Sequence, residues 1–581
     1  MLYDVAIIGA GPCGLATAAR LREKTPSALF THDEHARYWK KHKQQANSLE
    51  QEHKRRKRST DSGYSSGAEE LKRDTEVRPS IVVLDAGSDG WIATWKQRFS
   101  NLNIPHLRSP LFFHPDPGDR DGLLAFAHEQ GRVDELREIT NVVGKELSKH
   151  EKKRQHSRKK ARTTARHLRI DGRDQIDYYT PSTGLFEDYC DVLIKRYRLQ
   201  GLVQQAKVAD IVYDPEPEDL KHGLFTISTS TNGTFLSRIV VVATGASAAP
   251  SVPNLHQLPL PSQQNGSITH VFTPHGTGLP PHIHHKLQTN PSKPINIIIV
   301  GGGLTSAQLA HLFLMHHQSV HVHLLLRHSK LKCKPFDVDL SWVSKTRNHL
   351  MSTYWSVDTD EERLAMLREA RNGGSINPPF AKILQKHVAE RRLDIHTNTG
   401  LQLDKGCVWD DGTKVWTQLS LHRATDALNE ADNPFPNGVD HIVYCTGAAP
   451  SFDSIPFLSS LRDNAPIETL GGLPVLNENL MWNDDAPCFF TGALAALRLG
   501  PGAANLAGAR QGAERIVWRV EDLLGMKDTP SRVVRQSVAV GGSGEATKAD
   551  REEHKATAQE QSDFTGSFSN QFAALGVGEN D

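Results

Sequence analysis

The sequence predicts an α/β fold with two similar halves, because two short apolar strands each run into a glycine-rich turn and an apolar helix. The first is "VAIIGAGPCGLATAARL" near the start of the chain, and the second is "INIIIVGGGLTSAQLAHLFL" deep within it. A strand, a glycine turn and a helix in this order open a Rossmann unit. We therefore expect two Rossmann-like, three-layer ββα dinucleotide-binding domains in this chain of 581 residues, a length that suits several domains.

The first glycine turn has the spacing of a dinucleotide fingerprint. Gly9 allows a tight bend, Gly11 lets backbone approach a pyrophosphate, and Gly14 permits close packing of helix on strand. The acidic residue expected about 20 positions later is missing there, but "SIVVLDAG" supplies it further along the chain as Asp85. We expect Asp85 to bind a ribose, with an insertion between the helix and its strand.

Three polar segments interrupt or follow the two units: residues 40–79, residues 145–173 and the tail after about 527. Their composition is too polar to bury a core, so we expect disorder or solvated helix there. Basic runs at 54–58 and 158–162 are either solvated insertions, the simpler interpretation, or nuclear import signals or nucleic-acid contacts.

The second turn has the same spacing with serine in third place: Gly301, Gly303 and Ser306. Its next strand, residues 320–326, ends in Arg327 and not in an acid. A cation at this position pairs the 2′-phosphate of NADPH, so we expect this half to prefer NADPH over NADH. His328 and Lys330 could assist, and the alternative is that Arg327 is a solvated strand end.

Two further apolar strands end in Thr-Gly, at Thr244-Gly245 in "SRIVVVATGAS" and at Thr446-Gly447 in "VDHIVYCTGAAP". Glycine at a strand end allows a close approach of backbone to a ligand. Two fingerprints, each followed by such a strand end, predict two dinucleotides held face to face. This is the layout of a flavoprotein reduced by a nicotinamide.

Composition excludes several other classes. Lys plus Arg number 68 and Asp plus Glu 67, a net charge of +1, so no global field favours nucleic acid, which is an unlikely partner. The sequence contains no apolar run of about 18 residues, so it predicts no membrane-spanning helix. Six scattered cysteines without a CxxC pair fit a reducing compartment. We expect a cytoplasmic protein, with a nuclear location possible through the basic insertions.

The order GAGPCG, DGWIATW, ATG, GGGLTS and CTG resembles the flavin-dependent monooxygenases of the two-dinucleotide-binding type. These include the flavin-containing, Baeyer–Villiger and L-ornithine and L-lysine N-monooxygenases, and the resemblance spans about residues 1–525 outside the insertions. It implies FAD on the first fingerprint, NADPH on the second, and Trp91 and Trp95 against the flavin.

The resemblance also implies the chemistry. NADPH reduces the flavin, the flavin traps O2 as a C4a-(hydro)peroxide, and a small amine or other soft nucleophile is oxygenated. Two alternatives remain: a catalytically weak FAD/NAD(P)-binding regulatory or interaction protein, and an NADPH oxidase or dehydrogenase without oxygen insertion.

The sequence departs from the subfamily patterns at two places. "QNGSITHVFTP" keeps Gly266 and His270 of the flavin-containing monooxygenase motif but lacks its flanking aromatic residues. Asp440 and the following Thr-Gly match the N-hydroxylating pattern, but Ala448 replaces its tyrosine. The superfamily is therefore predicted more firmly than any one subfamily.

Side chains near the flavin are expected from two loops. In "LGPGAANLAGAR", Gly500 and Pro501 would start a helix whose positive end points at the flavin, with Asn505 as a side-chain contact. In "HLRSPLFFHPDP", Arg108 and His114 either bind an acidic substrate or brace a Pro-rich loop. We name no certain catalytic residue, and the candidates are Asn505, Arg108 and His270.

We expect an FAD domain formed by residues 1–292 and 437–526, an NADPH domain at 293–436 and a disordered tail at 527–581. The partners are a small-molecule substrate and O2, and the sequence gives no oligomeric state.

No metal is expected. "PPHIHHKLQ" places His282, His284 and His285 in a loop with no further ligand at metal spacing, and His321 and His323 share one face of a strand.

Overall fold

The structure is a computed structural model that describes residues 2–26, 78–140, 142–143, 172–217, 223–245, 267–273, 276–344, 346–402, 407–417, 419–423, 435, 438–448 and 451–526. The three polar segments therefore lie almost wholly outside the described residues, as does Gly266. In the described part, no helix is both long and apolar enough to cross a membrane. Both sheets belong to the unit formed by residues 1–524.

The first sheet has seven strands around β1 (Leu2–Ile8). Their order is β5 (Val203–Gln205), β2 (Ile81–Asp85), β1, β8 (Thr234–Val242), β7 (Leu224–Thr229) and β6 (Val208–Asp214), with β20 (Cys488–Phe490) also paired to β8. β1 runs parallel to β2 and β8, whereas β6, β7 and β8 are antiparallel. Parallel pairing ends β1, β2 and β8 at the same sheet edge, which brings Asp85 and Thr244 to the glycine turn after β1.

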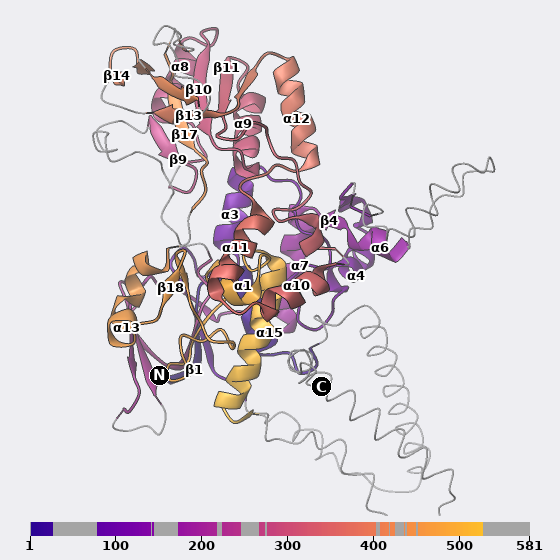
Figure 1. Cartoon of the computed structure of the whole chain (residues 1–581), viewed down its shortest axis with the longest axis vertical. Helices are drawn as coiled ribbons and strands as arrows, with labels where there is room; N and C mark the ends of the chain where they lie inside the picture. Colours follow the sequence, from indigo (N-terminus) through magenta and orange to yellow (C-terminus); the bar gives the residue numbers. More distant parts are fainter. Residues whose placement is uncertain are drawn as a thin grey trace, which may run out of the picture. The chain divides into compact units, whose positions relative to one another are not determined.

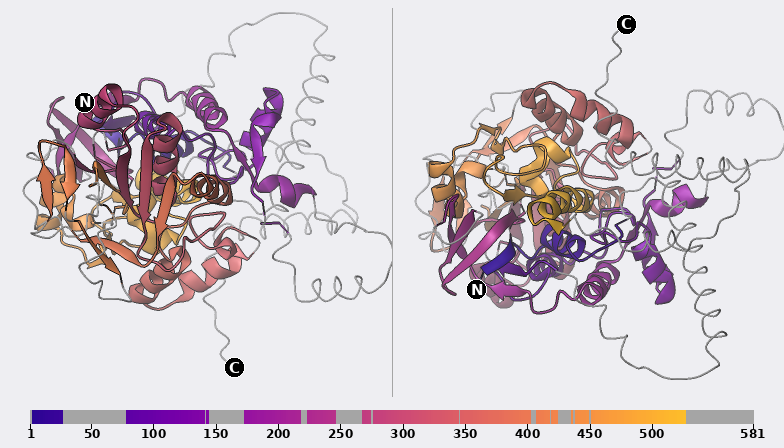
Figure 2. Two further views of the ribbon diagram at one scale, coloured as in Figure 1. Left: turned by 90° about the horizontal axis from the view of Figure 1, so that it is seen from above. Right: turned by 90° about the horizontal axis from the view of Figure 1, so that it is seen from below.

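Helices α1 (Pro12–Arg20) and α15 (Leu506–Leu523) pack along each other on this sheet, as the indigo and yellow ribbons of Figure 2 show. Helix α7 (Thr183–Arg196) begins at Ser182, whose hydroxyl caps the Leu185 N–H. It buries Leu185, Tyr189 and Leu193 in the same core.

The second sheet has five strands in the order β12 (Leu393–His396), β11 (Val320–Leu325), β10 (Ile295–Val300), β17 (His441–Tyr444) and β9 (Ile268–His270). All of its pairs are parallel. Helices α9 (Leu304–His316) and α12 (Pro378–Ala389) cover one face (Figure 1). The short hairpin β14 (Val408–Asp410) and β15 (Val415–Thr417), with β13 (Thr399–Gln402) and β16 (Ser420–Arg423), packs on the other. This confirms the ββα layering.

The remaining elements connect these layers. They are α3 (Ala93–Asn101), α4 (Gly122–Glu129), β3 (Leu136–Glu138), α6 (Gly172–Asp177), β4 (Tyr179–Pro181), α8 (Pro281–Thr289), α10 (Arg347–Ser356), α11 (Asp360–Arg371), α13 (Ser459–Asn464), β18 (Thr469–Leu470), β19 (Leu473–Pro474) and α14 (Ala496–Leu499). The expectation of a loop at His282, His284 and His285 is wrong, because they lie in α8. Pro281 is the first residue of this helix, and the fixed φ of proline suits that position.

Candidate cofactor-binding site

The glycines of the first turn each have a different steric reason. Gly9 has φ of 109°, and a Cβ on it would lie 2.7 Å from the carbonyl oxygen of Ala243 after β8. A Cβ on Gly14 would collide with the Gly9 carbonyl. At Gly11, by contrast, a Cβ would meet nothing within 4 Å. Two glycines are thus fixed by packing, and the third borders open space that a pyrophosphate could fill.

Asp85 lies beside this turn, as the sequence predicts. One carboxylate oxygen accepts a hydrogen bond from the Ala10 N–H at 2.8 Å, and the other accepts from the Gly87 N–H at 2.8 Å. Each oxygen keeps a second lone pair that could accept from a ribose hydroxyl. Thr244 lies against the same turn, because its Cα is 3.2 Å from the position of a Gly9 Cβ, and Gly245 follows with φ of 70°.

The tryptophan segment is attached to the turn through its backbone. The Ile92 N–H donates to the Ala10 carbonyl at 2.8 Å. Trp91 is buried and its indole N–H donates to the Leu199 carbonyl at 3.0 Å, while Trp95 stacks on Phe99 with ring centroids 3.8 Å apart. The two indoles therefore pack within the protein next to the first turn.

The second turn repeats the design of the first. Gly301 has φ of 142°, and a Cβ there would collide with the Cys445 carbonyl after β17. At Gly303 a Cβ would again meet nothing within 4 Å. The Ser306 hydroxyl donates to the Gly303 carbonyl at 2.6 Å, which fixes the start of α9.

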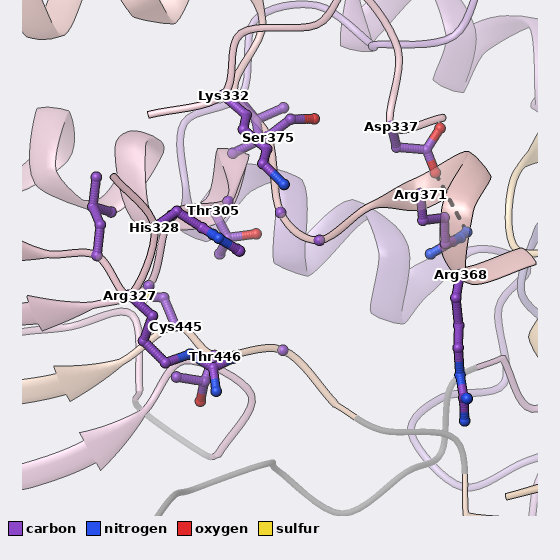
Figure 3. A pocket seen from close by; sticks show the side chains of 18 of the residues that line it. Thr305, Arg327, His328, Lys332, Asp337, Arg368, Arg371, Ser375, Cys445 and Thr446 are labelled. Carbon is purple, nitrogen blue, oxygen red and sulfur yellow. Dashed lines mark hydrogen bonds and ion pairs between the residues drawn. The ribbon is translucent and has the colours of Figure 1, made fainter. Parts of the chain in front are cut away.

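A cavity of about 970 Å³ opens over the second turn, and it reaches Thr446 and Gly447 at the end of β17. Its charged lining residues are Arg108, Arg327, Lys330, Lys332, Arg368, Arg371 and one carboxylate, Asp337. Figure 3 shows Arg327 and His328 at one side and Arg368 and Arg371 at the other. Such an excess of positive charge at a helix N-terminus suits an anionic, phosphate-bearing ligand.

Comparisons with known proteins agree with this geometry. Residues 175–449 match the family model for L-lysine 6-monooxygenase/L-ornithine 5-monooxygenase. Over this part the chain is similar to the flavin-dependent N-hydroxylating monooxygenases, in line with the resemblance seen in the sequence. Among solved structures of similar fold, an ornithine N-hydroxylase of Kutzneria contains reduced FAD, NADP+ and L-ornithine.

Solved structures share the fold. The ornithine hydroxylase of Pseudomonas aeruginosa is 14% identical with a TM-score of 0.54, over 90% of this chain and 100% of that one. The L-lysine 6-monooxygenase of Pseudomonas syringae is 14% identical with a TM-score of 0.52, over 90% and 99%. The FAD-bound cadaverine monooxygenase of Erwinia amylovora is 13% identical with a TM-score of 0.53, over 94% and 100%. The comparison with curated proteins gave no match.

Arg327 follows β11 by two positions, and its side chain is exposed at the cavity. It forms no ion pair or hydrogen bond with any described residue, and the same holds for Arg368 on α11. Arg371 instead pairs with Asp337 at 3.4 Å, and Lys332 donates to the Asn372 carbonyl at 2.6 Å. Among the described residues, the lining cations without an ion pair or hydrogen bond therefore include Arg327 and Lys330 near the end of β11 and Arg368 on α11.

Sequence reasoning missed the loop that closes on the second turn. Asn372 ends α11 with φ of 47°, and Gly373 follows with φ of 80°. A Cβ on Gly374 would lie 3.0 Å from the Cα of Gly303. The signal in the sequence was the Asn-Gly-Gly run after a helix, which favours left-handed backbone.

Arg108 braces loops around the cavity. Its guanidinium donates to the carbonyl oxygens of Lys334 at 2.9 Å, Pro335 at 3.2 Å, Phe336 at 2.6 Å and Ser375 at 3.2 Å. Burial lowers the pKa of Arg108 to about 10. Of the two roles left open by the sequence, bracing is the one these contacts support.

His114 is also held inside its loop. Its Nε2–H donates to the Arg120 carbonyl at 2.9 Å, while its Nδ1 accepts from the Asp116 N–H at 3.3 Å. Burial, reinforced by the charge of Arg510, lowers the pKa of His114 to about 4. The ring is therefore neutral near pH 7 and cannot attract an anion.

His270 ends β9 beside Tyr444 of β17. Its Nδ1 accepts from the Phe272 N–H at 3.2 Å, and burial lowers its pKa. Val271 and Phe272, the next residues, line the cavity. His270 thus stays a candidate at the edge of the site, without a charge.

The expected helix start at Gly500 and Pro501 is wrong. Gly500 ends α14 with φ of 79°, and α15 begins only at Leu506. Asn505 caps α15, because its side-chain oxygen accepts from the N–H groups of Ala507 at 3.1 Å and Gly508 at 3.4 Å. Asparagine is a strong N-cap, so this role explains the residue.

Arg510, in the first turns of α15, is a second feature that sequence reasoning missed. It is 7% exposed, and its Nε and Nη1 have no hydrogen-bond partner in the part of the chain that the structure describes. Burial, with the neighbouring charges of Arg120 and Arg347, lowers its pKa to about 10. Buried N–H groups of a cation that lack acceptors are costly, and a bound anion would reduce that cost.

Proposed function

We propose that the chain is an FAD- and NADPH-dependent monooxygenase that oxygenates the nitrogen of a small amine. The observation that carries this is the pair of glycine turns. In each turn the first glycine packs against the end of a neighbouring strand and has no room for a Cβ. The second glycine borders open space. The match to the lysine and ornithine monooxygenase model supports an amine as the substrate. FAD supplies the redox and oxygen chemistry when bound.

The described residues fit FAD at the first turn. Gly11 leaves room for a pyrophosphate, Asp85 offers lone pairs to a ribose, and Arg510 offers a buried positive charge at the same end of the helix pair. The protein's part is to bind and orient the cofactor and exclude water. We assign residues 1–292 and 437–526 to this FAD domain.

The second turn and its cavity fit NADPH. Gly303 leaves room for its pyrophosphate, and Arg327 is placed to pair the 2′-phosphate that NADH lacks. We assign residues 293–436 to the NADPH domain. The cofactor preference is thus set by a side chain at the end of β11.

The substrate would bind against the apolar part of the cavity lining that residues 493–504 contribute. These lining residues are Ala493, Ala496, Pro501, Ala503 and Ala504. Apolar surroundings disfavour a charged ammonium and lower an amine's pKa, which frees the nitrogen lone pair for oxygenation. Ornithine, lysine and cadaverine monooxygenases are among the solved structures of similar fold, and we propose an amine of this size for this chain.

The test compares product formation with NADPH use. FAD-loaded protein receives NADPH, O2 and, in separate reactions, L-ornithine, L-lysine, cadaverine or a small thioether. The proposal predicts close to one hydroxylated amine per NADPH with at least one amine. Peroxide equal to NADPH with every compound would instead indicate an oxidase, and a flavin that NADPH never reduces would indicate a regulatory protein.

A further inference from the structure

Four potential metal ligands lie on one face of the second sheet. β11 contributes "HVH" at 321–323 and β12 contributes "DIH" at 394–396. The strands are parallel, with His323 opposite Asp394 and Leu325 opposite His396. Because side chains two positions apart on a strand share a face, His321, His323, Asp394 and His396 all project from the face away from α9 and α12.

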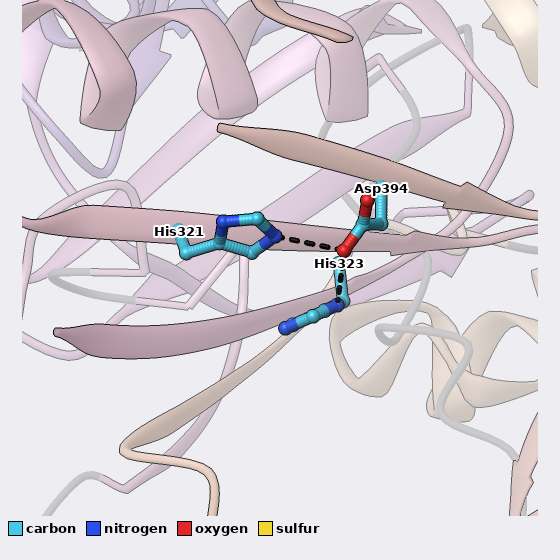
Figure 4. A group of neighbouring side chains, drawn as sticks. All are labelled: His321, His323 and Asp394. Carbon is cyan, nitrogen blue, oxygen red and sulfur yellow. Dashed lines mark hydrogen bonds and ion pairs between the residues drawn. The ribbon is translucent and has the colours of Figure 1, made fainter. Parts of the chain in front are cut away.

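The side-chain atoms converge (Figure 4). His321 Nε2 is 2.8 Å and His323 Nδ1 is 3.5 Å from the same Asp394 oxygen, Oδ2. Ligand atoms of these three residues all lie within 4.8 Å of one another. His396 Nε2 is 3.4 Å from His323 Nδ1. Four ligand atoms at about 2.0 to 2.1 Å around a tetrahedral zinc ion are roughly 3.3 Å apart, so two of these separations already match and the His321 contact must open by about 0.5 Å.

The surroundings suit a bound cation. His323 is 8% exposed, so a ligand atom from it would be shielded from water. Phe435 covers His323 edge-on at 4.9 Å between ring centroids. The Asp394 side chain is 53% exposed, which leaves an entry path for an ion.

We propose that His321, His323 and Asp394 bind one divalent transition-metal ion of the zinc class, with His396 as the fourth ligand. Three imidazoles and one carboxylate form a donor set for Zn²⁺, and not for Mg²⁺ or Ca²⁺, which prefer oxygen ligands. The ion would join the edge strand β12 to β11 through side chains.

The ion would also act on the strand ends nearby. The Leu326 N–H donates to the His396 carbonyl at 2.8 Å, and the Asn398 N–H donates to the His328 carbonyl at 3.0 Å. A metal bridge between β11 and β12 would therefore hold the backbone next to Arg327. The proposed metal site rests on these side-chain and backbone contacts, and it does not depend on which substrate the enzyme oxygenates.

The experiment measures Zn²⁺ binding by the full-length holoprotein. Protein is treated with a chelator, dialysed and titrated with Zn²⁺ against a chromophoric chelator, and bound metal is counted by mass spectrometry. We expect one tight equivalent in the wild type. His323→Ala and Asp394→Asn should each weaken it by at least about 100-fold, since loss of even an outer-shell partner costs about 10- to 100-fold.

The matched control is the double variant His284→Ala/His285→Ala, which removes two exposed histidines of α8 from the same domain. It should keep the tight equivalent. Bound FAD per chain and the far-UV circular dichroism spectrum report folding of each variant, and His321→Gln provides a milder second change. A wild type without a stoichiometric site, or correctly folded His323 and Asp394 variants that bind Zn²⁺ as tightly as the wild type, would overturn the proposal.

Discussion

The Arg20 guanidinium of α1 and the Glu514 carboxylate of α15 form a buried two-point ion pair, with N–O distances of 2.6 and 3.0 Å. Small side chains pack beside it, because Ala16 lies against Ala509 and Ala513. Contacts in this order along both helices mean that α1 and α15 run in the same direction. Their positive N-terminal ends therefore lie at the same side, where the glycine turn offers room for FAD.

Arg510→Met should separate cofactor binding from stability. The substitution removes a buried cation with two unsatisfied nitrogens, so the protein without FAD should gain about 1 to 3 kcal/mol in free energy of unfolding. FAD affinity should fall by about one to two decades, the value of a charge-assisted contact. Urea unfolding of the apoprotein and FAD titration measure the two effects.

The control for this prediction is Arg20→Met on the neighbouring helix. It leaves Glu514 buried without its partner and should destabilise the apoprotein by about 3 to 5 kcal/mol. If Arg510→Met destabilised the apoprotein as strongly, Arg510 would be a structural residue and not a cofactor contact.

Gly11→Val and Gly303→Val should each remove one cofactor and spare the other. Both backbones have negative φ, −73° and −90°, and both Cβ positions are open, so neither change strains the apoprotein. Gly11→Val should purify without FAD. Gly303→Val should stay yellow but lose NADPH-driven flavin reduction, while dithionite still reduces it. Each variant is the other's control, and a Gly11→Val protein with full FAD content would refute the first site.

Arg327→Ala should lower the preference for NADPH. Loss of a charge-assisted contact to the 2′-phosphate costs about 1.5 to 3 kcal/mol, or about one to two decades of affinity. Flavin reduction by NADH, which lacks that phosphate, should hardly change. Lys382→Ala, an exposed cation on α12, is the matched control for general charge. Equal losses with both nucleotides would mean that Arg327 supports the fold.

The parts of the site that depend on local backbone could be predicted from sequence. Gly9, Gly14 and Gly301 are required because backbone atoms lie too close to leave room for a Cβ. Asp85 is expected at the end of the next parallel strand, where it contacts the glycine turn. The start of α15 could not, because a glycine and a proline at 500–501 and an asparagine at 505 are all acceptable helix-start residues. Which one caps the helix depends on how α14 ends.

Contacts between distant segments were also beyond the sequence. Arg108 reaches carbonyl groups more than 200 positions away, and nothing local distinguishes it from a substrate-binding arginine. His321 and His323 were visible as a pair, but Asp394 joins them only through the pairing of β11 with β12. Arg510 looked like an ordinary helical arginine until its burial was known.

Two buried histidines should make stability depend on pH. Burial lowers the pKa of His441 to about 3, and burial with the charge of Arg510 lowers that of His114 to about 4. Below about pH 6.5 these two histidines bind protons in the unfolded chain but stay neutral in the folded protein. The free energy of unfolding therefore falls as the pH falls. Each histidine should cost about 2 kcal/mol between pH 7 and pH 5.

Urea unfolding at these two pH values tests this. His441→Gln should shrink the difference in unfolding free energy by about 2 kcal/mol, while His284→Gln, at an exposed position, should leave it unchanged. An unchanged difference in the His441 variant would mean that this histidine is protonated in the folded protein.

A monooxygenase of this kind would transfer one atom of O2 to the amine and release the other as water, with the two electrons supplied by NADPH through FAD. The most direct measurement is mass spectrometry of the product formed under ¹⁸O₂ in ordinary water, with the best amine of the panel. We expect one ¹⁸O atom in each hydroxylated amine and no hydroxylated amine without NADPH. A product that carries oxygen from water, or NADPH use that yields labelled hydrogen peroxide and no hydroxylated amine, would contradict it.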